Sequence, residues 1–221
     1  GGQAYYDDRK YFLFSPDAPV PQPARSAPLK PLSAPVHVQV DEDVPTPRIY
    51  LGFRLPVDNT VEFFAASAAM DALAELTIAR LERRLVRELE LATDISAASM
   101  GLIDNVSLGF FVAEAARGVP LERIEEIICE ELTRFGSQGP TAVEMEAVVA
   151  QNERAWLSQL ASLDERADHI SHAALLYDDP RAINTLLDRI GAVTADQVGE
   201  AAARWLAPSG RAVITYPGAG A

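Results

Sequence analysis

The sequence is poor in cysteine, histidine, basic residues and long apolar runs. Its 221 residues include one cysteine and three histidines, which excludes a disulfide framework and a cysteine-based zinc site. Nineteen Lys and Arg residues stand against thirty-two Asp and Glu residues, and the formal net charge is −13. Because nucleic acids and anionic membranes attract a surplus of basic residues, we expect neither as a partner. No apolar run reaches the roughly 20 residues of a membrane helix.

The remaining composition is ordinary for a globular protein, with 48% hydrophobic and 23% charged residues. The first residues combine neither a basic start nor an apolar core, so the sequence predicts no signal peptide. A cytoplasmic location is therefore the first expectation. A periplasmic or exported location would follow if a signal precedes the given sequence.

Prolines are concentrated at the start of the chain. Ten of the fifteen lie in the first quarter, and proline favours extended chain because it fixes φ and lacks an N–H donor. We interpret residues 1–46 as a proline-rich linker, in which residues 5–12 are a short remnant of a preceding unit. Residues 47–221 are the expected folded domain.

Hydrophobic periodicity predicts several strands. Alternation of apolar and polar residues indicates strands over 36–40 and 48–55, and a last strand over 211–216. Residues 93–101 and 107–117 alternate in the same way on either side of Asp104-Asn105, which is typical of a hairpin.

Capping residues and apolar stripes predict the helices between these strands. Asp58-Asn59 and Thr77 are expected helix starts, Gly136 an expected helix end, and Thr141 to Glu144 a capping box. The predicted helices span residues 61–76, 78–89, 121–135 and 141–177, with two more starting at Asp179 and Thr194. This order favours an α+β fold, an antiparallel sheet covered by helices on one face.

Residues with catalytic chemistry are scarce. His169 and His172 share one helix face, but a zinc site would need a third ligand, and the nearby acidic residues favour a solvated charged face. We interpret His37 in the same way and Cys129 as a core residue. The sequence contains no His-x-x-Glu-His, Gly-x-Ser-x-Gly or phosphate-loop motif. We therefore predict no catalytic residue and no metal ligand in this chain.

One segment resembles a known family. Residues 80–93 carry Arg-Leu, then Arg-Glu, then Leu-Ala-Thr, and this order resembles the helix-to-strand signature of the M16 metallopeptidases (insulinase, pitrilysin and processing peptidase). Residues 47–53 resemble the first strand of the second half of these proteins. The proline-rich stretch resembles their inter-half linker, and the resemblance covers residues 48–216.

The resemblance implies a fold and a division of labour. M16 proteins are built from similar α+β halves with a ferredoxin-like repeat, which close around a chamber for an unfolded peptide. One half hydrolyses the peptide with an inverted zinc motif, His-x-x-Glu-His, and a distal Glu, whereas the other half helps to bind it. This chain lacks the motif, so it resembles the second, inactive half and is not expected to be an enzyme alone.

The same resemblance places zinc and the general base in a catalytic half, either fused upstream or on a separate subunit. The complete protein or complex would then be a zinc metallopeptidase, and a homo-oligomer is a further option. Two substrate-binding residues follow from the signature: Arg87 matches its arginine, and Thr93 falls on its tyrosine position. The alternative role for Arg87 is an ordinary ion pair with Glu88, Glu90 or Asp94.

Two other functions stay open. The chain could be an M16-like structural or interaction subunit without peptidase work. It could also be a small-molecule or regulatory α+β module whose likeness to the family is accidental, in which case we expect a ligand-sized apolar pocket within the domain.

Overall fold

The computed structural model describes residues 32, 34–103 and 106–218. The predicted remnant at residues 5–12, most of the proline-rich stretch and Asp104-Asn105 lie outside the described residues. The strands form one sheet in the order β1-β5-β2-β4-β3, in which β1 and β5 are parallel and the other pairs are antiparallel. The strands are β1 (Val36–Gln39), β2 (Arg48–Leu55), β3 (Ala92–Met100), β4 (Ser107–Ala115) and β5 (Ala212–Tyr216).

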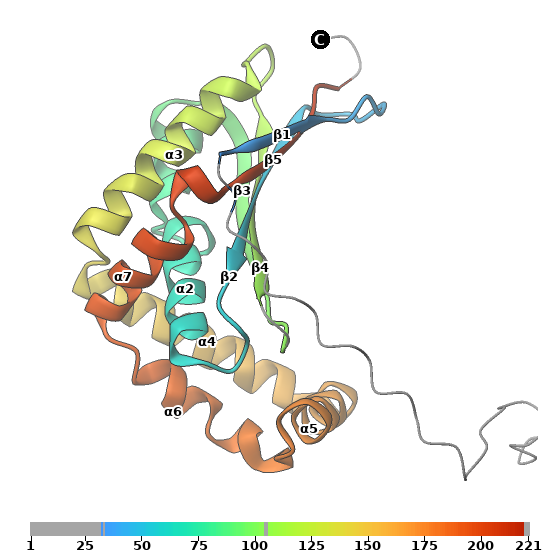
Figure 1. Cartoon of the computed structure of the whole chain (residues 1–221), viewed down its shortest axis with the longest axis vertical. Coiled ribbons are helices and arrows are strands. Elements are labelled where there is room, and N and C mark those ends of the chain that lie inside the picture. The colour runs from blue at the N-terminus through green and yellow to red at the C-terminus, as the bar shows by residue number, and fades with distance from the viewer. Residues whose placement is uncertain (1–31, 33, 104–105, 219–221) are drawn as a thin grey trace, which may run out of the picture.

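The helices pack on one face of this sheet, as Figure 1 shows. They are α2 (Val61–Met70), α3 (Leu121–Gln138), α4 (Ala142–Ala161), α5 (Leu163–Tyr177), α6 (Leu186–Gly191) and α7 (Ala195–Trp205), with π-helical segments Asp71–Glu75 and Glu82–Glu88 and 3₁₀ turns Pro180–Asn184 and Pro208–Gly210. The predicted α+β architecture is confirmed. None of the described helices is long and apolar enough to cross a membrane.

Alternation along the central strands fixes which face the helices cover. On β2, Ile49, Leu51, Phe53 and Leu55 are all buried, whereas the residues between them are only partly covered. Phe53 meets Phe111 of β4 edge to face at 6.1 Å between ring centroids. Since successive strand side chains point to opposite faces, one face forms the core.

The first strand joins this sheet from within the segment interpreted as linker. β1 pairs with β5, and its His37 lies 2.9 Å from the Glu125 carboxylate on α3. Apart from the place of β1 in the sheet, the boundary between linker and folded domain at residue 46 stays a prediction.

Two predicted helix starts were wrong. Thr60, not Asp58 or Asn59, caps α2, because its hydroxyl accepts the Phe63 N–H at 3.1 Å. Thr77 caps no helix and instead offers its carbonyl oxygen to Arg87. For Asp58, hydrogen bonds of its side chain to the Asn59 N–H and to Tyr177 replace the expected capping role.

The predicted helix end at Gly136 was also wrong, and close packing explains the glycine. Gly136 lies inside α3, where an added Cβ would come within 3.0 Å of the Ala203 Cα on α7. The helix ends instead at Gly139, with φ 70°. The capping box at Thr141 is confirmed, but the helical region after it breaks at Ser162 into α4 and α5.

A buried ionic cluster joins the helices to one another. Arg80 donates to the two Glu144 carboxylate oxygens at 2.6 and 2.7 Å, and to the Gly139 carbonyl at 2.9 Å. Glu131, 3.9 Å from Arg80, also pairs with Arg84 at 3.4 Å. Burial alone would raise the pKa of Glu144, but hydrogen bonds from Arg80 and from the backbone of Thr141 lower it. The carboxylate is thus held ionised in the interior.

Removing one member of this cluster should destabilise the fold. We expect Arg80→Ala to lower the free energy of unfolding by about 3–5 kcal/mol, because it leaves buried carboxylates without their cation. Chemical denaturation would measure this loss. Arg123→Ala, which breaks an exposed ion pair with Glu126, is the control and should change it by less than about 1 kcal/mol. Equal losses in the two variants would contradict the prediction.

Candidate functional site

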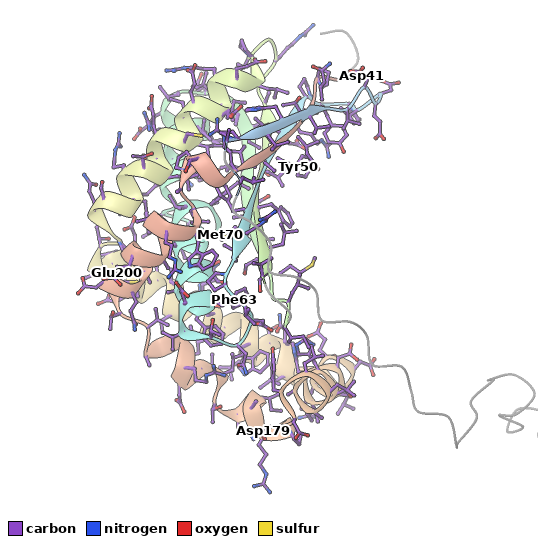
Figure 2. All side chains as sticks on the ribbon, viewed as in Figure 1. Asp41, Tyr50, Phe63, Met70, Asp179 and Glu200 are labelled. Carbon is purple, nitrogen blue, oxygen red and sulfur yellow. The ribbon has the colours of Figure 1, made fainter. Side chains whose placement is uncertain are left out.

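The sheet face opposite the helices is open and apolar. Cross-strand register puts Tyr50 of β2, Val112 of β4 and Ile214 of β5 side by side on this face. Among the described residues no helix lies over it, and Tyr50 is on this side of the sheet while Phe63 and Met70 belong to the helix layer (Figures 1 and 2). The exposed large apolar residues of this face are Val36, Val38, Met100, Leu108 and Ile214, between 39% and 52% exposed. Since large exposed apolar patches are typical of interaction sites, this face, which also carries Arg54 opposite Leu108, is a candidate for one.

One end of the open face is polar. Arg48 lies 3.5 Å from the Glu114 carboxylate, and its Nε is buried without a hydrogen-bond partner among the described residues. Next to it the Tyr50 and Tyr216 rings meet edge to face at 5.7 Å between centroids. This end therefore has hydrogen-bonding groups and aromatic edges beside the apolar surface.

Arg87 lies on the π-helical segment that precedes β3. Its side chain is 56% exposed and its Nε lies 3.5 Å from the Glu82 carboxylate, while it donates to the Thr77 carbonyl at 3.3 Å. Arg87 forms no ion pair with Glu88, Glu90 or Asp94, the partners considered from the sequence, and Glu88 pairs with Arg83 instead. The guanidinium is held loosely and reaches solvent.

Thr93 is the extra residue of a β-bulge at the start of β3. Ala92 and Asp94 pair with the consecutive residues Ala115 and Glu114 on β4, so Thr93 has no cross-strand partner. Its hydroxyl lies 3.5 Å from the Glu114 carbonyl oxygen, and the residue is exposed. Bulges re-aim side chains, and this one sets Thr93 apart from the alternation of its strand.

The paired histidines do not converge on a common ligand. The His169 ring packs on Trp156 with centroids 4.5 Å apart and bonds to Gln159, whereas His172 bonds to Tyr177 at 3.1 Å. The described part of the chain contains no group of three or more His, Cys, Asp or Glu residues that could hold a metal ion. The donor set of this chain therefore does not fit a zinc site.

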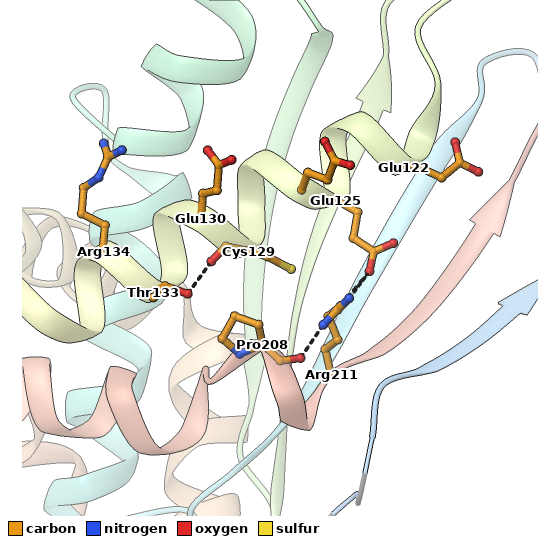
Figure 3. Close-up of a pocket in the computed structure, with 9 residues that line it drawn as sticks. Glu122, Glu125, Cys129, Glu130, Thr133, Arg134, Pro208 and Arg211 are labelled. Carbon is orange, nitrogen blue, oxygen red and sulfur yellow. Dashed lines mark hydrogen bonds and ion pairs between the residues drawn. The ribbon is translucent and has the colours of Figure 1, made fainter.

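A wide hollow lies along α3, and Figure 3 shows the residues around it. Four glutamates, Cys129 and Arg211 line a space of about 800 Å³. Arg211 lies 2.6 Å from Glu125 and compensates that charge, and Nε2 of His37 lies 2.9 Å from the same carboxylate. Burial raises the pKa of the Cys129 thiol, so the thiol stays protonated and is a poor nucleophile. The hollow contains no activated chemical group.

A second cavity, of about 440 Å³, lies at the end of the sheet between α2, α4 and α5. Asp58 and Tyr177 meet there through a hydrogen bond of 2.5 Å from the tyrosine hydroxyl to the carboxylate. Sequence reasoning missed this pair, because its members are 119 positions apart and Asp58 looked like a helix cap. This cavity has the size of the pocket expected for a small-molecule or regulatory module, so taken alone it favours that alternative.

Beside this cavity a partly buried carboxyl group lies in the helix layer. Asp71 accepts a hydrogen bond from the Asn152 amide at 3.0 Å. Burial raises the pKa of Asp71 to about 6, and Asn152 offsets only part of this effect.

The family of the chain follows from a family model. Residues 8–152 match the model described as the peptidase M16 inactive domain, which is about two thirds of the sequence. The chain belongs to this family. A search of curated proteins returned no match.

Solved structures have the same fold as this M16 inactive domain. A protease from Helicobacter pylori superimposes with a TM-score of 0.79 at 17% identity, over 98% of this chain and 52% of that protein. The inactive peptidase domain of a Bordetella parapertussis protein gives 0.72 at 22% identity, over 81% of this chain and 95% of that one. The periplasmic protease PqqL from Escherichia coli gives 0.67 at 18% identity, over 90% of this chain and 22% of that protein. The chain thus spans about half of the H. pylori protease.

The family assignment confirms the resemblance seen in the sequence. An M16 inactive domain implies a catalytic M16 half, fused or separate, and the sequence has no His-x-x-Glu-His motif of its own. The roles of Arg87 and Thr93 stay predictions. The two residues lie on consecutive elements, the π-helical segment and the start of β3, but they have different partners.

The raised pKa of Asp71 leads us to expect an unusual pH dependence of stability. Its folded pKa, about 6, exceeds its ordinary value of 3.8, so the folded state binds the proton more tightly. The free energy that protonated Asp71 contributes to folding is therefore fully present below pH 4. It is lost as the pH rises through 6, and the loss is up to about 3 kcal/mol. We expect Asp71→Asn to raise the free energy of unfolding at pH 7.5 and to flatten this pH dependence in denaturation experiments. An unchanged pH profile would contradict the assignment.

Proposed function

We propose that this chain is the non-catalytic half of an M16-type zinc endopeptidase and that the open face of its sheet binds unfolded peptide. In this proposal the catalytic half supplies zinc and the general base, and the two halves enclose the peptide between them. The observation that carries the proposal is the open apolar sheet face. It supports peptide binding because an unfolded peptide exposes apolar side chains that a folded partner would bury.

Flatness and polarity at the border of this face favour an extended peptide. Gly52 and Ala212 pair across β2 and β5, and because glycine has no side chain and alanine a small one, little projects from the middle of the face. Arg48 and the two tyrosines lie at one end of it. Apolar burial supplies affinity without directional demands, and the guanidinium can donate to peptide carbonyls. A surface with these properties binds peptides of many different sequences rather than a single one.

Substitutions on the open face should weaken peptide binding. We expect Leu108→Ser and Ile214→Ser, made in the complete protein or complex, each to raise KM for an unfolded peptide about tenfold, the factor that corresponds to about 1.4 kcal/mol of lost burial. Zinc content and kcat should not change. Steady-state kinetics measure the effect, and Val143→Ser, at a 64% exposed position on α4, is the matched control.

The alternative role, a structural subunit, gives a different result in the same experiment. If the open face only contacts the other half, the substitutions would reduce assembly and leave KM of the assembled fraction unchanged. That outcome would contradict peptide binding by this face.

Arg87 is the proposed second contact with the peptide. Its exposed guanidinium has five donors, of which the contacts to Glu82 and Thr77 use only part, so it can also hold peptide carbonyls or support a developing oxyanion. Thr93, on the adjoining strand, is proposed to add a hydroxyl contact. Its short side chain and its existing bond to Glu114 imply a smaller contribution.

Arg87→Ala should lower peptide turnover by the assembled enzyme about tenfold without changing its zinc content. Arg83→Ala is the control on the same helical segment, because it breaks a similar exposed ion pair, to Glu88 at 3.4 Å. Turnover assays and zinc analysis of both variants test the role. Turnover by Arg87→Ala that matches wild type, or that falls no further than in Arg83→Ala, would remove Arg87 from the site.

A further inference from the structure

The cavity at the end of the sheet is built like a binding pocket. Its volume of about 440 Å³ lies within the roughly 300–1,000 Å³ of small-ligand sites. Aromatic rings from three helices face it: Phe63 and Phe64 from α2, Trp156 from α4 and Tyr177 from α5. Aliphatic side chains from the segment 182–190 close another side. Rings on several sides can contact the body of one ligand group.

The hydrogen bonds within the pocket leave several acceptors and few donors unused. Tyr177 donates its hydroxyl proton to Asp58, so the phenol oxygen accepts from Nε2 of His172. Gln159 offers its carbonyl oxygen to Nε2 of His169. When neutral, each histidine therefore has Nδ1 as an acceptor. The Asn152 amide donates to Asp71 and to the Val148 carbonyl, which leaves its oxygen as a further acceptor.

The charged groups of the pocket lining also favour a cation. Asp58 is the one carboxylate of the pocket lining, and no lysine or arginine belongs to the lining among the described residues. Asp58 accepts one hydrogen bond on each oxygen, from Asn59 and from Tyr177, so about half of its lone pairs are unused. Gly101 makes room for this carboxyl group, because an added Cβ would come within 2.5 Å of it.

Arg189, whose guanidinium lies near the pocket but outside its lining, shows how this region holds a cation. Arg189 lies over the Phe64 ring at 4.9 Å from its centroid and bonds to the side chain and backbone of Asn59. It thus occupies one face of Phe64 and the loop next to Asp58. The rings of Phe63, Trp156 and Tyr177 each meet one neighbouring ring and present their remaining surface to the pocket. Cation–π contact and a nearby oxygen acceptor hold this cation in place.

We propose that this pocket binds a basic side chain, arginine or lysine, of a peptide. Aromatic faces, a carboxylate and a surplus of acceptors match a donor-rich cation with an apolar stem. The pocket lies on the helix side of the sheet, where Ser99 and Gly101 line it, at the end of β3 whose Met100 belongs to the open face. That the cation belongs to a peptide rests on the proposed function, whereas recognition of the cation by the pocket does not.

Small probes test the pocket directly on the 221-residue chain and on its complex with the catalytic half. N-acetyl-arginine amide should bind with a Kd on the order of 1 mM, measured at pH 8 by NMR shifts of residues around the pocket. N-acetyl-citrulline amide, which has nearly the same shape without the charge, should bind at least tenfold more weakly. Asp58→Asn should weaken binding of the arginine probe by a similar factor.

The control variant is Asp178→Asn, which removes the same charge next to Tyr177 but outside the pocket lining, at a left-handed position that asparagine tolerates. It should leave the Kd within about twofold. Should Asp58→Asn fail to fold, the arginine and citrulline comparison on the wild type still decides. Equal binding of these two probes, tighter binding of N-acetyl-phenylalanine amide, or no binding of any probe would overturn the proposal. The KM measurements on the open face are independent of this outcome.

Discussion

The constraint on which the described structure depends is that its helices cover one face of the sheet and leave the other without a helix. Apolar residues alternate along β2 and β4, and the inward-facing residues of both strands are almost entirely buried. The outward-facing residues of β2, β4 and β5 also include Tyr50, Leu108, Val112 and Ile214, so both faces of the sheet carry apolar side chains. The proposed peptide site uses the face that the described helices leave uncovered.

The sheet edges are handled differently from the face. At β3, an edge strand, the Glu75 carboxylate accepts the outward-pointing N–H of Ala97 at 2.5 Å. A side chain that occupies an edge donor hinders pairing with a further strand. At the opposite edge, β1 is only four residues long. Interaction is therefore directed to the open face and to the ends of the sheet rather than to its edges.

The ionic cluster around Arg80 connects stability with the proposed peptide contacts. Arg80 and Arg84 hold the start of the segment that carries Arg87 against α3 and α4, through Glu131 and Glu144. The buried members fix the segment, and Arg87 three residues further is exposed at its end. The cluster thus fixes the backbone that carries Arg87, while its side chain stays exposed. The proposed peptide contact of Arg87 would depend on this placement and not on the fold itself.

Local patterns determined much of this structure in advance. The strands, the hairpin, the capping box at Thr141 and the helix start at Thr194 depend on residues within a few positions of one another, and so the sequence alone was sufficient for them. The same holds for the family, because the signature in residues 80–93 is contiguous. The absence of a zinc motif was likewise readable from the sequence, and with it the expectation of a catalytic half elsewhere.

Only the tertiary structure decided what depends on distant contacts. Asp58 and Gly136 looked like helix boundaries, yet Asp58 pairs with Tyr177 and Gly136 allows α3 to approach α7. The bulge at Thr93 and the aromatic pocket also depend on contacts between segments whose proximity no local pattern encodes. The physical reason is that a short polar residue or a glycine suits several roles equally well, and packing selects one of them.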